Sequence, residues 1–400
     1  RQKFQSLFQK FPKNVSSLLL FFSPISLLPS HPQPESMADD DKENCVRMTR
    51  AATKRKAAMA AATIDEERIN KKKRVVLGEL PNLCNIKKPR RKATKVITTK
   101  QKNPVSIPTL ANTNLDIDTR SDDPQMCAPY VTSIFEYLRQ LEGKAKSRPL
   151  IDYIDKIQKD VTSSMRGVLV DWLVEVAEEY KLLSETLYLA VSYIDRFLSL
   201  KTVNRQRLQL LGVASMLIAS KYEEITPPNV NDFCYITDHT YTKQEIVKME
   251  ADILLALEFE LGNPTSNTFL RRFTRVAQED FQMSPLQMEF LCSYLSELSM
   301  LDYNSLKFLP SIVAASAVFL ARFIIRPKQH PWNVMLEEYT KYKAGDLKEC
   351  VRMIHDLYLS RKGGALQAIR EKYKQHKFKC VATMPVSPEL PLTVFEDVNI

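Results

Sequence analysis

The clearest hydrophobic pattern in the chain has the period of an α-helix. Apolar residues recur three and four positions apart between Leu187 and Leu198, which gives one apolar stripe. A second segment, Leu208 to Ser220, is apolar almost all round and contains small residues such as Gly212 and Ala214. A single stripe predicts a helix packed on one side, whereas an all-round apolar surface predicts a helix at the centre of a domain.

The pattern of a central helix returns about a hundred residues later. Leu309 to Arg322 reads LPSIVAASAVFLAR, against LQLLGVASMLIASK from Leu208 to Lys221. We interpret the two segments as the central helices of a duplicated helical domain. Gly262-Asn263-Pro264 is the predicted joint, because proline disfavours helix in the residue before it.

The first third of the chain has no such pattern. Residues 37–125 are polar, charged and nearly free of aromatic residues, so they cannot bury enough apolar surface to offset the entropy lost on ordering. We predict a disordered regulatory tail there. Residues 1–36 contain no Met and precede Met37, so we interpret them as a translated upstream segment, the alternative being a secretory signal around Leu18 to Leu28.

Composition favours an all-α fold after the tail. The chain has only 8 Gly, and its 22 Pro crowd into the first third and the C-terminal end. The middle therefore lacks the turn residues that many short strands would need. No apolar run approaches the about 20 residues that span a bilayer, so no membrane association is expected.

The formal net charge of +10 is unevenly distributed. Residues 37–120 hold 20 Lys and Arg against 10 Asp and Glu, whereas residues 121–400 hold 33 against 36. A basic groove for nucleic acid in the folded part is therefore not expected. The 7 Cys are odd in number and never form a C-x-x-C pair, which argues against disulfides and zinc and favours a reducing compartment.

Motifs for catalysis are missing from the sequence. There is no glycine-rich phosphate loop, no nucleophile elbow, no H-E-x-x-H and no kinase catalytic loop. The 5 His are scattered singly. We therefore predict a protein that is not an enzyme and that uses no cofactor or metal.

The most informative stretch is MRGVLVDWLVEVAEEYKLL, from Met165 to Leu183. On a helix, Met165, Val168, Leu169 and Trp172 form one apolar face, and an ordinary core stripe is the simple interpretation of that face. The stretch also resembles the hydrophobic-patch motif of cyclins, in particular the W-L-V-E-V-x-E-E-Y-K-L run of plant A-type cyclins.

Five spaced positions that define a cyclin box match as well: Arg166, Asp195, Leu210, Lys221 and Glu250. The resemblance runs from about Tyr130 to Phe378 and implies two tandem five-helix cyclin boxes after the tail. The predicted domains are 126–262, the N-terminal box with a preceding helix, and 263–380, the C-terminal box. Residues 381–400 would form a C-terminal tail.

The resemblance implies that Lys221, Glu250 and Phe259 bind a cyclin-dependent protein kinase. For Lys221, the simpler interpretation is a cation placed favourably at a helix C-terminus. Arg166 and Asp195 have a structural role that follows from residue type. They are charges in otherwise apolar helices, so we predict a buried ion pair between them.

The resemblance also implies a docking groove for substrates and inhibitors that carry an Arg-x-Leu motif. Such a peptide needs an apolar slot for its Leu and a carboxylate for its Arg. The groove residues would be Met165, Val168, Leu169, Trp172, Glu175 and Gln209, with the apolar members exposed. Gly167 and Val168 stand where the family more often has Ala and Ile, which leaves fine peptide specificity open.

The tail contains two matches to degradation signals. Lys42, Glu43 and Asn44 form a KEN box, and the destruction-box pattern R-x-x-L-x-x-L-x-N is met by Arg74, Leu77, Leu80 and Asn82. A ubiquitin ligase would be the partner that recognises them. Basic clusters at 71–74 and 87–92 indicate nuclear import, the alternative being solvated charge runs, so we expect a nuclear protein with a cytoplasmic fraction.

The sequence thus predicts a regulatory subunit that activates a cyclin-dependent serine/threonine kinase, recruits Arg-x-Leu substrates and controls cell-cycle progression. Two alternatives fit the sequence less well. A B-type mitotic cyclin is disfavoured by the run LVEVAEEYKL. A transcription-factor protein with tandem cyclin folds would need a basic face and usually a zinc ribbon, and neither is present in the sequence.

Overall fold

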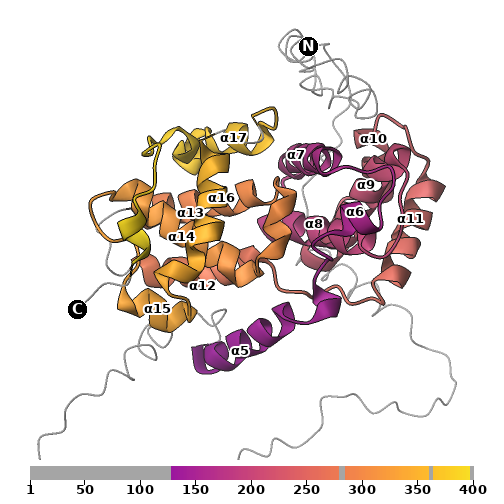
Figure 1. Ribbon diagram of the computed structural model, residues 1–400. Helices are drawn as coiled ribbons and strands as arrows, with labels where there is room; N and C mark the ends of the chain where they lie inside the picture. The colour runs from indigo at the N-terminus through magenta and orange to yellow at the C-terminus, as the bar shows by residue number, and fades with distance from the viewer. Residues whose placement is uncertain (1–127, 279–283, 360–363, 397–400) are drawn as a thin grey trace, which may run out of the picture. The chain divides into compact units, whose positions relative to one another are not determined.

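The computed structural model describes residues 128–278, 284–359 and 364–396. These residues form α-helices and short 3-10 helices, with no strand among them (Figure 1). The all-α prediction is confirmed for this part of the chain. The upstream segment, the regulatory tail and its two degradation motifs lie outside the described residues.

The first helical domain, called the first box below, consists of five helices. They are α7 (Ser163–Glu179), α8 (Ser184–Leu198), α9 (Leu208–Glu223), α10 (Val230–Ile236) and α11 (Lys243–Ala256). The longer α5 (Val131–Glu142) and the single turn α6 (Tyr153–Lys156) precede it. Helix α9 packs against α7, α8 and α11, and its residues from Leu208 to Ser220 are all buried, as the apolar pattern predicted.

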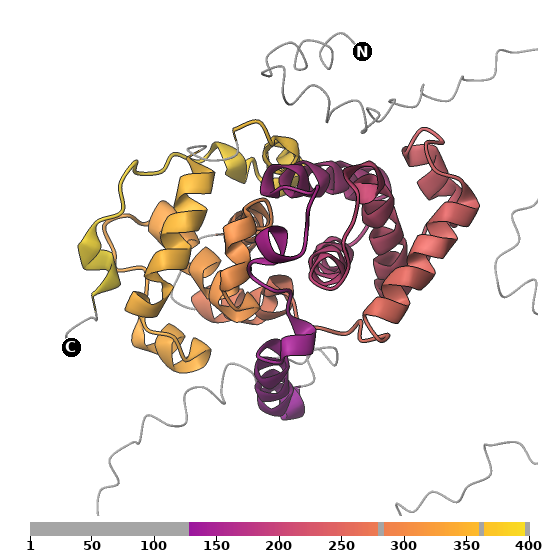
Figure 2. The same ribbon diagram turned by 45° about the vertical axis from the view of Figure 1, so that its right-hand side comes forward.

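The second box repeats this arrangement. Its helices are α12 (Ser266–Gln278), α13 (Pro285–Ser299), α14 (Pro310–Ile325), α15 (Val334–Thr340) and α16 (Ala344–Tyr358), and the short α17 (Ala368–Tyr373) follows them. Helix α14 packs against α12, α13 and α16, and it is as fully buried as α9. The predicted pair of central helices is therefore present, and the turned view in Figure 2 shows the two groups of helices.

Local sequence signals explain where several helices begin. The Thr162 side chain accepts a hydrogen bond from the Met165 amide at the start of α7, 3.3 Å away. Thr242 and Glu245 form a reciprocal capping box at the start of α11. Pro310 occupies the first turn of α14, where a missing N–H costs nothing.

Helix α5 precedes the first box in sequence, yet it packs against the second. The Glu142 carboxylate accepts hydrogen bonds from the Ser311 amide and hydroxyl, at 2.9 and 2.6 Å, near the start of α14. Arg139 donates to the Thr340 carbonyl at the end of α15, and Phe135 meets Phe269 of α12 edge to face. Burial raises the pKa of the Glu142 carboxyl.

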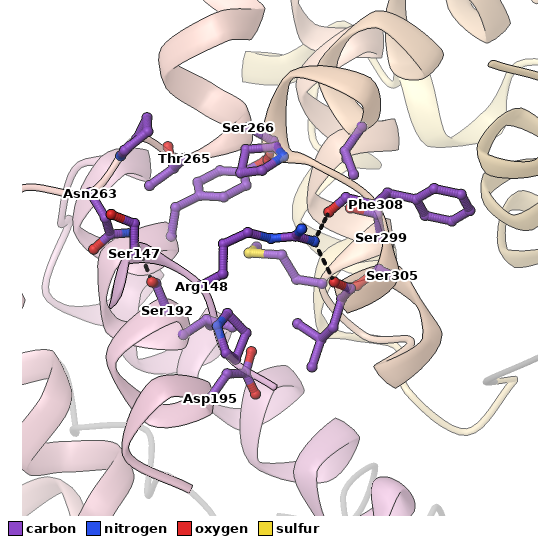
Figure 3. A pocket seen from close by; sticks show the side chains of 18 of the residues that line it. Ser147, Arg148, Ser192, Asp195, Asn263, Thr265, Ser266, Ser299, Ser305 and Phe308 are labelled. Carbon is purple, nitrogen blue, oxygen red and sulfur yellow. Dashed lines mark hydrogen bonds between the residues drawn. The ribbon is translucent and has the colours of Figure 1, made fainter. Parts of the chain in front are cut away.

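The two boxes meet at a cavity of about 120 Å³ (Figure 3). The side chain of Arg148 lies across it, and its Nη2 donates to the carbonyls of Leu306 and Phe308, at 3.0 and 3.2 Å. Asn263, from the linker between the boxes, donates to the Ser192 hydroxyl at 2.8 Å. The linker is thus bonded to the first box by side chains as well as by the chain itself.

The predicted C-terminal tail is a part of the second box where the structure describes it. Val381, Val394 and Phe395 are buried, and the ring of Phe395 stacks on Phe319 of α14 with centroids 5.2 Å apart. The carbonyl of Ser387 is 2.9 Å from Nε2 of His355 in α16. The prediction of a tail beyond residue 380 was wrong here, because these apolar residues complete the core of the box.

Candidate partner-binding surfaces on the first box

The predicted buried ion pair is present. Arg166 Nε and Nη2 donate to the two carboxylate oxygens of Asp195, each at 2.7 Å, and the Tyr153 hydroxyl donates to the same carboxylate at 2.9 Å. Burial would lower the pKa of the Arg166 guanidinium, but the Asp195 carboxylate outweighs burial and raises it. Arg166 Nη1 also donates to the Met300 carbonyl at 2.6 Å, so the pair joins the two boxes as well as two helices.

The other charged residues of the five-residue set lie at the surface. Lys221 lies in the last turn of α9, and its Nζ is 2.6 Å from Glu250 Oε1 on α11. The Lys221 side chain is 48% exposed and that of Glu250 13%. The fifth member, Leu210, is buried in α9. The sequence did not predict that Lys221 and Glu250 would bond one another.

Exposed apolar side chains surround this ion pair along the chain. Phe259, three residues after α11, is 63% exposed and has a left-handed backbone with φ of 58°. Leu255, in the last turn of α11, is 68% exposed, and Ile225, two residues after α9, is fully exposed. Exposed apolar residues that follow the helices of a polar pair are compatible with a protein-binding surface.

The predicted docking groove differs from the sequence expectation in one respect. Its apolar members Met165, Leu169 and Trp172 are only 6%, 0% and 6% exposed, so the prediction of an exposed slot was wrong. They are buried because α9 lies close to α7. A Cβ added at Gly212 of α9 would stand 2.7 Å from Leu169 Cδ1.

The remaining members of the groove, Gln209, Glu175 and the apolar Val168, are placed differently. Gln209 of α9 is 2% exposed, and neither its amide nitrogen nor its amide oxygen has a hydrogen-bond partner. Val168 and Glu175 are partly exposed on α7. Burial raises the pKa of the Glu175 carboxyl. A buried amide without partners is costly, and an incoming peptide backbone would supply both a donor and an acceptor.

Helix α17 lies against α7 beside these residues, a contact that the sequence did not predict. Asp171 of α7 accepts hydrogen bonds from the amides of Gln367 and Ala368, at 3.2 and 3.0 Å, and so caps α17. Burial, with a smaller contribution from the Glu175 charge, raises the pKa of the Asp171 carboxyl to about 7. The sequence could not predict this contact, because the carboxylate and the short helix that it caps are 196 residues apart and share no periodic pattern.

Ionic contacts also hold α17, to α13 as well as to α7. Lys372 of α17 is 7% exposed and donates to both carboxylate oxygens of Glu297 in α13, at 2.9 and 3.0 Å. The Lys372 ammonium also lies 3.7 Å from Glu178 of α7, and Lys377 is 2.7 Å from the same carboxylate. Helix α7 is therefore bonded to the segment that follows the second box.

Residues that could hold a metal are not grouped in the described part of the chain, where no cluster of three or more His, Cys, Asp or Glu has suitable geometry. No helix there is long and apolar enough to cross a membrane.

Comparison with family models gives two adjacent matches. Residues 133–262 match the model of the cyclin N-terminal domain, and residues 264–387 match that of the cyclin C-terminal domain. The matches meet at Asn263, within the predicted joint. A viral cyclin from herpesvirus saimiri shares the fold, with a TM-score of 0.50 and 23% identity over 57% of this chain and 96% of that one.

Comparison with individual proteins shows which group of cyclins the chain resembles. The chain is 87% identical to cyclin-A3-1 of Arabidopsis thaliana over 90% of this chain and 99% of the relative. It is 70% identical to cyclin-A3-2 of the same plant, over 90% and 100%. The chain therefore belongs to the cyclin family, among the A-type cyclins of plants.

Proposed function

We propose that this cyclin binds and activates a cyclin-dependent serine/threonine kinase through the surface around Lys221 and Glu250. The observation that carries the proposal is the Lys221–Glu250 ion pair at the surface, which joins α9 to α11, with exposed Leu255 and Phe259 at and just after the end of α11. Exposed Ile134 and Tyr137 of α5, with Tyr130 just before it, offer further apolar area at helical spacing. Lys146, just after α5, bonds Glu258 next to Phe259 at 2.7 Å, so α5 leads to the same surface.

Activation follows from differential binding. A protein without catalytic groups can stimulate a kinase only by binding its active conformation more tightly than its inactive one. The two members of the ion pair are already aligned by α9 and α11, so the surface needs little ordering before a partner binds. We therefore expect no phosphate transfer by the chain alone and strong stimulation of its kinase.

Substitution of both members of the pair tests this surface. Lys221→Ala with Glu250→Ala should cost about 2–5 kcal/mol of kinase affinity, because charged contacts to the partner are lost. The fold should keep its helical circular dichroism, since exposed ion pairs contribute little. A matched control is Lys156→Ala with Asp152→Ala, which removes another exposed pair of 2.6 Å. Equal affinity in both double variants would contradict the proposal.

We further propose that the α7–α9 groove binds Arg-x-Leu peptides. The unpartnered Gln209 amide would bond the peptide backbone, and Glu175 would pair with the peptide arginine. Because Met165, Leu169 and Trp172 are buried, their replacement would damage the core, so the polar residues make the better test. Glu175→Ala should weaken phosphorylation of Arg-x-Leu substrates and spare a short peptide with only the phosphorylation site.

A matched control for that test lies one turn further along the same helix. Glu179 is exposed on α7, so Glu179→Ala removes an equal charge outside the groove. If the two variants lose activity on Arg-x-Leu substrates equally, a general charge effect explains the result and the groove is excluded.

The tail motifs support a proposal about turnover and location. The KEN box at 42–44 and the destruction-box pattern from Arg74 to Asn82 would recruit a ubiquitin ligase. The basic clusters at 71–74 and 87–92 would direct the chain to the nucleus. Deletion of residues 37–125 should yield a protein that still activates kinase but persists at mitotic exit. The same decay rate with and without the tail would show that the matches arose by chance.

A further inference from the structure

A groove of about 340 Å³ lies between the segment that follows α5 and the C-terminal ends of α8 and α11. Its apolar side chains are Leu150, Leu200 and Leu257, and its basic side chains are Lys146, Arg148 and Arg196. We call it the basic groove. It contains none of the residues assigned above to the kinase surface or the Arg-x-Leu groove, apart from Lys146 and Glu258, which border the kinase surface.

The side chains that line the basic groove carry more positive than negative charge. Arg196 is 4% exposed, its Nη1 donates to the neutral Asn263 side chain at 3.1 Å, and no described carboxylate forms an ion pair with it. Burial lowers its pKa. Arg148 bonds only carbonyl oxygens, and the single acidic residue lining the groove, Glu258, already pairs with Lys146. A buried cation without a counter-charge is unfavourable, so an anionic occupant would be stabilised here.

The occupant should also carry apolar side chains. Leu150 and Leu200 are 49% and 56% exposed at the groove, and Leu150 is held beside α8 by a bond from its amide to the Ser199 hydroxyl at 2.9 Å. Exposed leucines next to basic side chains fit an extended peptide in which acidic and apolar residues alternate. Such a peptide presents its carboxylates on one side and its apolar groups on the other.

We propose that the occupant is a segment of this chain, Leu115-Asp116-Ile117-Asp118, which lies in sequence just before the described residues. It alternates apolar and acidic residues, as the groove requires. The acidic run at 39–41 does not, because it has no apolar residue among its carboxylates. Asp116 and Asp118 would pair with the basic side chains, while Leu115 and Ile117 would contact the exposed leucines.

The length of chain between the segment and the described body permits this contact. The described residues begin at Ala128, and α5 then runs about 18 Å to Glu142, three residues before the groove. Residues 119–127 can span about 30 Å when extended. The segment can therefore return alongside α5 to the basic groove without strain.

Hydrogen exchange of the full-length chain, without kinase, tests the proposal directly. Asp116→Asn with Asp118→Asn removes the two charges and should speed amide exchange of residues 145–150 by about tenfold, since docking protects them. The matched control, Asp122→Asn with Asp123→Asn, makes the same charge change just outside the segment and should leave exchange unchanged. Equal exchange in both double variants would overturn the proposal and leave the groove to another protein.

Substitution on the groove side separates docking from local damage. Leu200→Ala removes an exposed side chain that lines the groove and leaves the Lys146–Glu258 pair intact. It should speed exchange in the wild-type background and add nothing in the Asp116→Asn, Asp118→Asn background, because the contact is already lost there. Leu183→Ala, a change at another exposed leucine outside the groove, should have no effect in either. Additive effects of the Leu200 and Asp116/Asp118 changes would refute the docking, whatever the kinase experiments show.

Discussion

At the level of single residues, burial separates the charges that hold the fold from those available to a partner. Arg166 and Glu297 are almost fully buried, and each is satisfied by several hydrogen bonds. Lys221 and Phe259 are exposed and hold nothing together beyond one ion pair. Substitution should therefore unfold the chain in the first group and weaken binding in the second.

Removal of the buried arginine tests this division. Arg166→Met should destabilise the fold by about 3–5 kcal/mol, because the Asp195 carboxylate would be left buried without its counter-charge. The change should appear in urea denaturation of the free protein. Arg166→Met with Asp195→Leu should recover a large part of the loss, since no charge is then stranded. A double variant as unstable as the single one would show that the guanidinium matters for other reasons.

Asp171 should make stability depend on pH. Its pKa is about 7 in the folded chain and near 3.8 when unfolded, so between these values only the folded chain retains the proton. The stability that this proton contributes is complete below about pH 4 and is lost as pH rises through about 7, with a slope of at most about 1.4 kcal/mol per pH unit. Asp171→Asn should flatten that decline in urea denaturation at several pH values. An unchanged slope would show that a group other than Asp171 takes up the proton. Glu179→Gln, which changes an exposed carboxyl on the same helix, serves as the control.

At the level of helices and segments, the sequence predicted the helices that have a periodic apolar pattern. It did not predict the contacts between helices that are far apart in the chain. The stripe from Leu187 to Leu198 and the all-round apolar segment from Leu208 are both helices, and the second is central as predicted. The first was expected to pack on one side, but α8 is buried on nearly all sides because both boxes cover it. The Arg166–Asp195 pair could be predicted because two charges in apolar helices need one another. The burial of Leu169 depends on how closely α9 approaches at Gly212, and helical periodicity carries no information on that distance.

The C-terminal segment offers a prediction at this scale. Phe395→Ala should destabilise the second box by about 2–4 kcal/mol, because a buried ring stacked on Phe319 is lost. Leu392→Ala, in the same short 3-10 helix but 57% exposed, should change the melting temperature little. Thermal denaturation of both variants decides whether the segment belongs to the core. Equal small effects of the two variants would show that the C-terminal segment does not contribute to the core.

At the level of the whole molecule, the two boxes are coupled through charged contacts at α7. The Arg166 bond to the Met300 carbonyl, the Asp171 cap on α17 and the Glu178 contact with Lys372 all cross between them. Each leaves a polar group without its partner if the boxes separate. We therefore expect the boxes to unfold together.

Dissection of the chain tests that coupling. A fragment of residues 126–262 should be far less stable than residues 126–400. It lacks the partners of the three contacts between the boxes and the part of the second box against which α5 packs. Circular dichroism melting curves of the two proteins measure the difference. A fragment that melts at the same temperature as the longer protein would show that the first box is independent.

The position of α5 has a consequence for the history of this fold. Its partners Ser311, Thr340 and Phe269 all belong to the second box, although α5 precedes the first box in sequence. An ancestor with a single box would have offered this helix none of these partners. The packing of α5 in this chain therefore depends on the duplication of the box, because a single box alone would leave the helix without these contacts.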